Sequence, residues 1–559
     1  MRNIFKNRNL YLLGLIFIVA LFTFFNLPRT FYQQDEWQTL GHNLAGGMGI
    51  FASANPLSLL FGELRPLSGF IYLIFLGFYK FTVIPIAIFG IVFQIINAIL
   101  TFYLTDKITK NKLIALLASL FLITNSVSHQ AVTWASAIGT LPATTLILVA
   151  LIFYLKYFEK EKKEYLLFGL VSTITSILFK GVGLFLFILL PLTFFIFKGK
   201  PVNKKNVIDV LERNKLLLGF GFLMVLVRSG QFFSSAKGAA GFISAGNNNN
   251  TLVTIISHSF LYPFTSLFQI FVPPLDLYSI TIPLAKMQYK FLVGSPLTDL
   301  VAQSIVADMF AIIGSVLILA LIVFMAYKYK DKIMNRNIIF ALLFLFLSFL
   351  PYVVLDRDSS YLSSRYFYIS AIPAGILFGY LIYFIINIHR YIKWATYILV
   401  FLFLFHHISI IRKDIDYQVR LGNERKAVLN GIKNLYPRIE RDSIFYVTSN
   451  KPYSGDITNP FQSGLGYILE VWYYDSGNIP KEFLRENFLW DLGAEGYRKS
   501  GEFGFGYFQD IDKMSKEMKE KKLSMNTVHG FFIDSRTQQV SDITNDLRAR
   551  IATISAIPK

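Results

Sequence analysis

The chain has 559 residues, of which 54% are hydrophobic and 16% charged, and its mean hydropathy is +0.49. Soluble domains have about a quarter of their residues charged, so this composition excludes an ordinary soluble fold and indicates a protein built from membrane-spanning helices. The net charge of +19 is explained by basic cytoplasmic loops, and the absence of cysteine excludes disulfides, thiolate metal sites and a cysteine nucleophile.

The first apolar run, residues 10–27, follows Arg2, Lys6 and Arg8. The run is long for a signal peptide, and the sequence after it, NLPRTFYQQ, lacks the small residues of a cleavage site. We therefore predict a retained transmembrane helix with a cytoplasmic N-terminus. The next apolar run, residues 67–79, is short and aromatic, and we predict that it lies at the outer membrane surface as a juxtamembrane helix.

Basic clusters between the later apolar runs set the predicted topology. Lysine and arginine gather at residues 107–112, 156–163, 198–205, 328–336 and 390–393. Because such clusters remain in the cytoplasm, the helices between them must come in pairs. We predict further membrane helices near residues 83–104, 113–126, 138–157, 165–180, 182–197, 216–228, 304–327, 338–355, 366–387 and 394–410. Residues 251–272 are predicted to lie flat or re-enter, which leaves about eleven transmembrane helices.

The predicted fold class is an α-helical polytopic protein of the cell (plasma) membrane with a small C-terminal α/β extracytoplasmic domain. Residues 1–410 form the transmembrane domain, whose outer side has a first loop with juxtamembrane helices at 28–82 and a second large loop at 229–303. The histidines at 406 and 407 are predicted to end the last membrane helix. Residues 411–559 are soluble in composition, with strands predicted at 443–449 and 529–535 and helices at 416–435 and 510–523.

The topology places a set of polar residues at the outer ends of helices. They are Asp35, Glu36, His42, Glu63, Arg65, His129, Trp134, Lys180, Arg228, Asp356, Arg357, Asp358, Arg365 and Tyr366. A carboxylate there suits a general base toward a hydroxyl group, and cations at headgroup depth suit a phosphate. The ordinary alternatives are a helix-capping acid, a basic side chain that reaches the lipid headgroups, and a structural ion pair.

Three of these positions support the functional prediction. Asp35 and Glu36 are adjacent acids shortly after the first membrane helix. Arg65 precedes Pro66, a residue that suits the first turn of a helix, so a cation stands at a helix N-terminus. Lys180 lies at a hairpin on the face poor in positive charge, which indicates an anionic partner.

The order of these motifs resembles that of the GT-C membrane glycosyltransferases, nearest the protein O-mannosyltransferase and lipid A aminoarabinose transferase type. The motifs are DE at 35–36, the Arg-Pro pair at 65–66, FKG at 179–181 and SRYFY at 364–368, within a similar layout over residues 5–410. The resemblance implies transfer of a sugar from a polyprenyl-phosphate carrier to a lipid, glycan or protein acceptor at the outer face, with inversion of the anomeric centre.

The resemblance also implies roles for single residues. Asp35 matches the catalytic base and Glu36 its acidic neighbour. The predicted substrate-binding residues are Arg65, Lys180, Arg365, Tyr366, Trp37 and His129. No cofactor is required, and a divalent cation, Mg²⁺ or Mn²⁺, at Asp35 and Glu36 is left open. The chain departs from the family pattern in LRPLSG, with arginine for lysine and a single proline, and in the lack of a threonine before FKG.

Two other classes of function remain open from the sequence. A transporter or flippase of lipid-linked saccharides would show internal repeats and broken helices, and no repeat is evident. A polymerase or ligase that uses pyrophosphate-linked donors would suit the large outer loop at 229–303. No nucleic-acid partner is expected, because the basic residues are those of membrane-protein loops.

Overall fold

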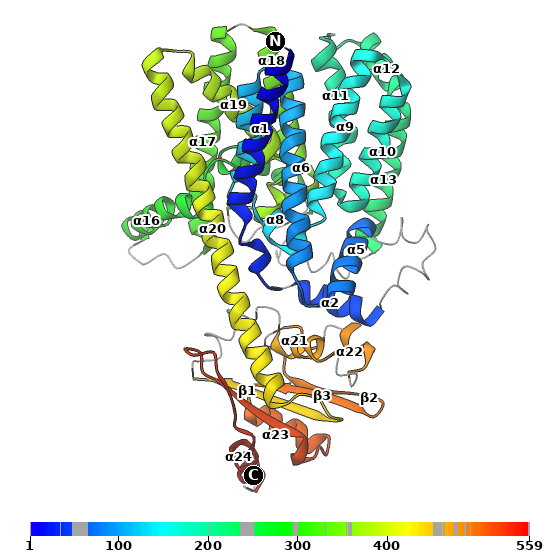
Figure 1. Cartoon of the computed structure of the whole chain (residues 1–559), viewed down its shortest axis with the longest axis vertical. Helices are drawn as coiled ribbons and strands as arrows, with labels where there is room; N and C mark the ends of the chain where they lie inside the picture. Colours follow the sequence, from blue (N-terminus) through cyan, green and yellow to red (C-terminus); the bar gives the residue numbers. More distant parts are fainter. Residues whose placement is uncertain are drawn as a thin grey trace. The chain divides into compact units, whose positions relative to one another are not determined.

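The computed structural model describes residues 2–33, 35–46, 65–199, 201–234, 251–293, 300–329, 331–353, 355, 360–450, 461, 464–474, 479–485, 488–491 and 493–556. The chain forms two compact units, seen in Figure 1. Unit 1 contains Met1–Phe25, Asn55–Ser68 and Ile88–Lys413, and unit 2 contains Asn26–Ala54, Gly69–Ala87 and Asp414–Lys559. Unit 2 therefore includes the predicted C-terminal domain together with two segments of the predicted first outer loop.

Unit 1 is helical. Its helices are α1 (Arg2–Phe24), most of α6 (Ile84–Thr109), α7 (Lys112–Thr124), α8 (Gln130–Thr133), α9 (Thr140–Lys160), α10 (Lys163–Phe179), α11 (Leu186–Lys198), α12 (Lys204–Arg213), α13 (Lys215–Ser234), α15 (Thr251–Gln269), α16 (Pro274–Val293), α17 (Leu300–Tyr329), α18 (Lys332–Phe349), α19 (Ala371–Ile386) and the first part of α20 (Arg390–Leu435). Short 3-10 helices join them at η3 (Ala135–Ala137), η4 (Gly181–Phe185), η5 (Leu350–Tyr352) and η6 (Ser364–Tyr366).

Seven helices of the described residues are long and apolar enough to cross a membrane, or eight if one bent pair counts as a single span. Four shorter apolar helices accompany them, at Pro66–Gly77, Lys112–Thr124, Lys215–Val227 and Ala371–Ile386. By the length and composition of these helices the chain is a membrane protein. The count of eleven crossings and the orientation of the termini stay predictions.

Close helix packing in unit 1 depends on two glycines of α19. A Cβ atom at Gly375 would lie 2.7 Å from the backbone oxygen of Ala118, and one at Gly379 would lie 2.9 Å from that of Ile114. Both contacts are shorter than a Cβ atom tolerates, so only glycine lets α19 approach α7 this closely. Small residues at helix contacts are common in membrane proteins for this reason.

The segment around residue 270 is sharply bent. The axes of α15 and α16 differ by 105° across the break. Asn125 donates a hydrogen bond to the Ile270 carbonyl at 2.7 Å, and the Tyr361 hydroxyl donates one to the Val272 carbonyl at 2.9 Å. These bonds satisfy backbone groups that the break leaves without helical partners. Residues 274–293, which we predicted as part of an outer loop, form a helix.

Helix α20 has 46 residues and extends beyond the predicted last membrane helix. The prediction that His406 and His407 end that helix is wrong, because the helix continues through them to Leu435. The predicted helix at 416–435 is its continuation. No proline interrupts residues 390–435, and Pro437 follows the last turn, which is where proline usually stands.

Unit 2 is built on a five-stranded mixed sheet with the strand order β2-β3-β1-β4-β5. The central strand β1 (Ser443–Ser449) pairs in parallel with β3 (Phe503–Phe508) and β4 (Val528–Ile533). The edge strands β2 (Gly496–Ser500) and β5 (Val540–Asp542) pair antiparallel with β3 and β4. The strands predicted at 443–449 and 529–535 are confirmed by β1 and β4.

Helices cover both faces of this sheet (Figure 1). On one face, Ile444 packs with Met514 of α23 (Ile511–Glu520) and Leu547 of α24 (Thr544–Ala556), which confirms the helix predicted at 510–523. On the other face, the Phe445 ring meets the Tyr473 ring with centroids 5.9 Å apart. Helices α21 (Leu465–Trp472) and α22 (Lys481–Arg485) lie on this second side, and α2 (Asp35–Gly46) packs against both.

The helix predicted at 67–79 is present as α5 (Pro66–Tyr72), which continues into a π-helical turn, η2 (Leu73–Gly77). Its location at the membrane surface stays a prediction. The boundary between the two compact units falls inside this helix, since Ser68 belongs to unit 1 and Gly69 to unit 2.

Candidate functional site

A buried lysine in unit 1 follows the last residue of α10. Lys180 has an extended backbone (φ −159°) and is 8% exposed. Its ammonium group donates a hydrogen bond to Thr140 Oγ1 at 2.7 Å and lies 5.6 Å from the centroid of the Tyr366 ring. Because Thr140 is the first residue of α9, the ammonium group is held where two helix ends meet. These contacts satisfy only part of its hydrogen-bonding capacity, since an ammonium group has three donors.

Arg365 lies beside this lysine on η6. Its guanidinium carbon is 4.4 Å from the Trp134 ring centroid and 4.9 Å from the Tyr366 ring centroid, and Nη2 donates to the Tyr366 hydroxyl at 3.2 Å. Cation–π contacts of this kind fix the plane of a guanidinium group. The Tyr366 ring therefore contacts two cations, and the Tyr352 ring packs against it with centroids 4.5 Å apart.

Arg65 reaches the same neighbourhood through the start of α5. The Ser68 hydroxyl donates a hydrogen bond to the Phe179 carbonyl at 2.6 Å, directly before Lys180. A Cβ atom at Gly139 would lie 2.0 Å from Ser68 Oγ, so the glycine leaves the space in which this serine sits. One turn of helix therefore brings Arg65, itself exposed, to the level of Lys180.

The three side chains form what we call the cation cluster: Arg65, Lys180 and Arg365. The Lys180 ammonium group is buried, and the positive charges of Arg65 and Arg365 act on it. None of the three forms an ion pair with a carboxylate of the described residues. The guanidinium and ammonium donors of these three side chains are of the kind that suits phosphate oxygens.

The acidic pair lies in unit 2, on α2. Asp35 is the first residue of that helix and is exposed. Glu36 is 3% exposed, and its carboxylate accepts a hydrogen bond from the Gln33 backbone N–H. Acids in the first turn also interact favourably with the helix dipole. The convergence of Asp35 with Arg65 and Lys180 stays a prediction.

Glu36 has a buried counterpart in the same unit. Arg425 of α20 is 3% exposed, and the Glu36 carboxylate attracts its guanidinium group. Sequence reasoning missed this arginine, because it stands in a charged stretch that resembles an ordinary solvated helix. His42 lies further along α2. Burial lowers its pKa, and a backbone hydrogen bond with Arg485 opposes this shift.

Trp37 is completely buried. The rings of Phe31, Tyr32, Phe81 and Trp472 surround it, with centroids 5.5–6.4 Å away. Its indole has no exposed surface in this structure, so the ring fixes α2 by packing. Contact between Trp37 and a sugar, as the sequence predicted, would require these aromatic neighbours to move.

His129 lies in unit 1, directly before α8. Its ring Nδ1 is 2.6 Å from the Ser126 carbonyl, and the next residue, Gln130, donates its backbone N–H to Ser364 Oγ at 3.4 Å. The segment that holds His129 therefore contacts the segment that holds Arg365. Of the other predicted outer residues, Glu63, Asp356, Arg357 and Asp358 and the Arg228 side chain lie outside the described residues.

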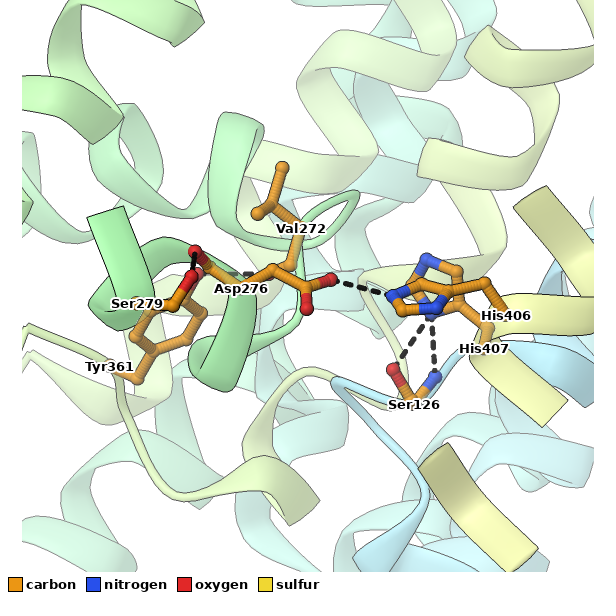
Figure 2. Close-up of polar contacts among 7 residues, drawn as sticks. All are labelled: Ser126, Val272, Asp276, Ser279, Tyr361, His406 and His407. Carbon is orange, nitrogen blue, oxygen red and sulfur yellow. Dashed lines mark hydrogen bonds and ion pairs between the residues drawn. The ribbon is translucent and has the colours of Figure 1, made fainter. Parts of the chain in front are cut away.

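A second polar cluster, which sequence reasoning missed, adjoins the bend between α15 and α16 (Figure 2). His406 of α20 forms an ion pair with Asp276 of α16, with Nε2 and Oδ2 2.7 Å apart. His407 contacts Ser126, whose backbone N–H donates to His407 Nδ1 at 3.2 Å and whose Oγ lies 2.8 Å from the same nitrogen. These contacts attach α20 to two segments of unit 1, and they give the adjacent histidines a structural role.

Comparison with known proteins gives structural likenesses only. No family model matches the chain, and no curated protein matches its sequence. The Archaeoglobus fulgidus oligosaccharyltransferase in the apo form is similar at 12% identity and a TM-score of 0.42, over 90% of this chain and 70% of that one. Oligosaccharyltransferase AglB from the same organism, in complex with an inhibitory peptide and a dolichol-phosphate, is similar at 12% identity and a TM-score of 0.43, over 96% of this chain and 74% of that one. We draw no residue correspondence from these likenesses.

Proposed function

We propose that this protein is a membrane glycosyltransferase of the GT-C type, which moves a sugar from a polyprenyl-phosphate carrier to an acceptor at the outer face of the plasma membrane. The observation that supports it is the cation cluster. Arg65, Lys180 and Arg365 come from distant parts of the sequence and have no carboxylate partner among the described residues. Lys180 and Arg365 contact the same Tyr366 ring in unit 1, and the positive charge of Arg65 acts on Lys180. A carrier phosphate would supply the missing negative charge.

In this proposal the cluster binds the phosphate in the ground state and stabilises the charge that it gains as it leaves. The acceptor oxygen forms a bond to the anomeric carbon while the bond from that carbon to the phosphate oxygen breaks, and its electron pair stays with the phosphate. Asp35 accepts the proton of the acceptor hydroxyl group. Because attack comes from the side opposite the leaving group, the configuration of the sugar is inverted.

The remaining predicted residues have supporting roles in this proposal. Glu36, held by Gln33 and attracted by Arg425, positions the start of α2. Tyr366 orients Lys180 and Arg365, and His129 lines the same region of unit 1. The proposed topology places the N-terminus in the cytoplasm and the C-terminal part of unit 2 outside.

The acidic pair, Asp35 and Glu36, is the place where a divalent cation was left open. No group of three or more histidine, aspartate or glutamate side chains that could hold a metal ion occurs in the described part of the chain. Glu36 is buried with its carboxylate bonded to a backbone N–H, whereas Asp35 is exposed. We therefore derive no step through Mg²⁺ or Mn²⁺.

Mass spectrometry of the lipids that copurify with the full-length protein tests the proposal. We expect a polyprenyl monophosphate, with or without a sugar, and we expect Arg65→Ala and Arg365→Ala to reduce the bound amount. A matched variant, Lys162→Ala, removes an exposed cation from the loop between α9 and α10 and should retain the lipid. A pyrophosphate-linked saccharide would instead favour a polymerase or ligase, and retention of the lipid by all variants would refute the role of the cluster.

A further inference from the structure

A second basic site lies in unit 1, in a cavity of about 250 Å³. Its lining includes four cations, Lys107, Lys110, Lys198 and Arg336, one acid, Glu159, and five apolar residues. The cavity shares no residue with the cation cluster. Such a combination of several positive charges with apolar walls suits a ligand that has both a phosphate and a hydrocarbon part.

The lining residues show where along the helices this cavity lies. Lys107, Glu159 and Lys198 stand within the last four residues of the candidate spans Ile84–Thr109, Ala135–Lys160 and Gly181–Lys198. Ile333 and Arg336 stand in the first turns of the span Lys332–Tyr352. Four candidate spans thus begin or end around the cavity, which puts it at the membrane–water boundary. Its basic residues belong to three of the clusters that the positive-inside rule assigns to the cytoplasm.

The ion pairs around the cavity leave positive charge uncompensated. Lys107 pairs with Glu159 at 2.6 Å, and Lys198 pairs with Glu161 at 3.3 Å. In the described part of the chain, Lys110 and Arg336 form no ion pair with a carboxylate. The cavity therefore holds two cations that are available to a ligand.

Arg336 is held in place for such a contact. Its Nη1 donates to the Phe197 carbonyl at 3.1 Å, and its guanidinium carbon lies 5.3 Å from the Phe197 ring centroid. Its Nε is buried and has no hydrogen-bond partner among the described residues. A buried donor without a partner costs free energy that a bound acceptor would recover.

We propose that this cavity binds the phosphate headgroup of an anionic glycerophospholipid of the cytoplasmic leaflet. Lys110 and Arg336 would contact the phosphate, and an acyl chain would lie along the apolar wall, where Ile333 is 51% exposed. The volume is below the ~300–1,000 Å³ of pockets that enclose drug-sized molecules. It therefore fits a headgroup whose chains remain in the bilayer better than a whole soluble nucleotide.

The test compares the full-length protein in nanodiscs of phosphatidylglycerol and of phosphatidylcholine, with native mass spectrometry to count retained lipids and thermal unfolding to measure protection. One variant is Lys110→Asn. Lys110 has a left-handed backbone (φ 55°), which asparagine adopts readily, so this substitution removes the charge without backbone strain. The second variant adds Arg336→Gln. The control, Lys204→Gln with Lys205→Gln, removes two exposed charges at the start of α12.

We expect the wild type and the control to retain phosphatidylglycerol. Each cavity charge that is removed should weaken the binding of this lipid about 5-fold. Equal retention by wild type and cavity variants would overturn the proposal. Protection in phosphatidylcholine by millimolar inorganic phosphate, equal to that given by phosphatidylglycerol, would also overturn it, because the site would then bind a soluble anion. Loss of retention in the control as well would assign the effect to general surface charge and reject the cavity.

Discussion

Replacement of Lys180 by methionine should change stability and donor binding in opposite directions. Lys180→Met keeps the length of the side chain but removes a buried cation that two arginines repel. The substitution loses the hydrogen bond to Thr140, worth about 1 kcal/mol, and the contact with Tyr366, worth about 1–2 kcal/mol. It also removes a desolvation cost of several kcal/mol. We therefore expect the free energy of unfolding to rise by roughly 1–3 kcal/mol.

Donor binding should become weaker in the same protein. A hydrogen bond between an ammonium group and a phosphate contributes ~1.5–3 kcal/mol, so the affinity for a polyprenyl monophosphate should fall by roughly 10- to 150-fold. Thermal unfolding and equilibrium binding of the detergent-solubilised protein measure the two effects, with the exposed Lys162→Met as control. A variant that binds the lipid as tightly as the wild type would refute the phosphate contact. A less stable variant would show that Lys180 is structural.

Three further predictions concern unit 2. Asp35→Asn should abolish sugar transfer, measured with a radiolabelled donor, while the free energy of unfolding changes by less than about 1 kcal/mol. The control Asp512→Asn should keep its turnover, and an Asp35→Asn protein with the same turnover as the control would disprove the assignment of the base. Burial raises the pKa of Glu470 well above its ordinary value, although the positive charge of Arg498 opposes the shift, and neither carboxyl oxygen has a hydrogen-bond partner among the described residues. Glu470→Met should therefore raise the free energy of unfolding by about 1–3 kcal/mol, measured by chemical denaturation. A loss of stability would show that the carboxyl group has a partner that this structure does not describe. Burial lowers the pKa of His529 to about 4, below its value in the unfolded chain, so its contribution to stability is complete above about pH 6.5 and is lost as the pH falls toward 4. The loss in the free energy of unfolding should be roughly 1–2 kcal/mol after allowance for partial exposure. His529→Asn should reduce this pH dependence of stability, and the same dependence in the variant and the wild type would refute the prediction.

Helices and strands with a strong local pattern could be predicted from the sequence. Residues 443–449 read as a strand and form β1, because an apolar β-branched and aromatic run is sufficient to specify a buried strand. Helix α16 was not predicted, because Asp276, Lys286 and Lys290 interrupt its apolar residues. The full length of α20 was missed for a related reason. Its composition changes from apolar to mixed polar near residue 411, which favours a domain boundary, whereas the helical backbone continues through that change.

The candidate site could be predicted only in part. Lys180 was found because a lysine on the face poor in positive charge departs from the usual distribution of basic residues. Its partner Thr140 was not found, because the two residues are 40 positions apart and an isolated threonine carries no signal. The packing of Trp134 on Arg365 depends on the same kind of long-range contact. Asp35 stands in the unit that does not contain the cation cluster, so its role depends on the test of turnover.

The contacts at the bend between α15 and α16 have a consequence for biogenesis. As the chain is synthesised, Asn125 has already emerged when Ile270 appears, since it precedes it by 145 residues. Tyr361 and Ser360 are made later, 89 residues after Val272 and 91 after Gln269. The bent hairpin is therefore inserted before its later partners exist, and the membrane-insertion machinery must shelter the Val272 carbonyl until the ribosome has added Tyr361.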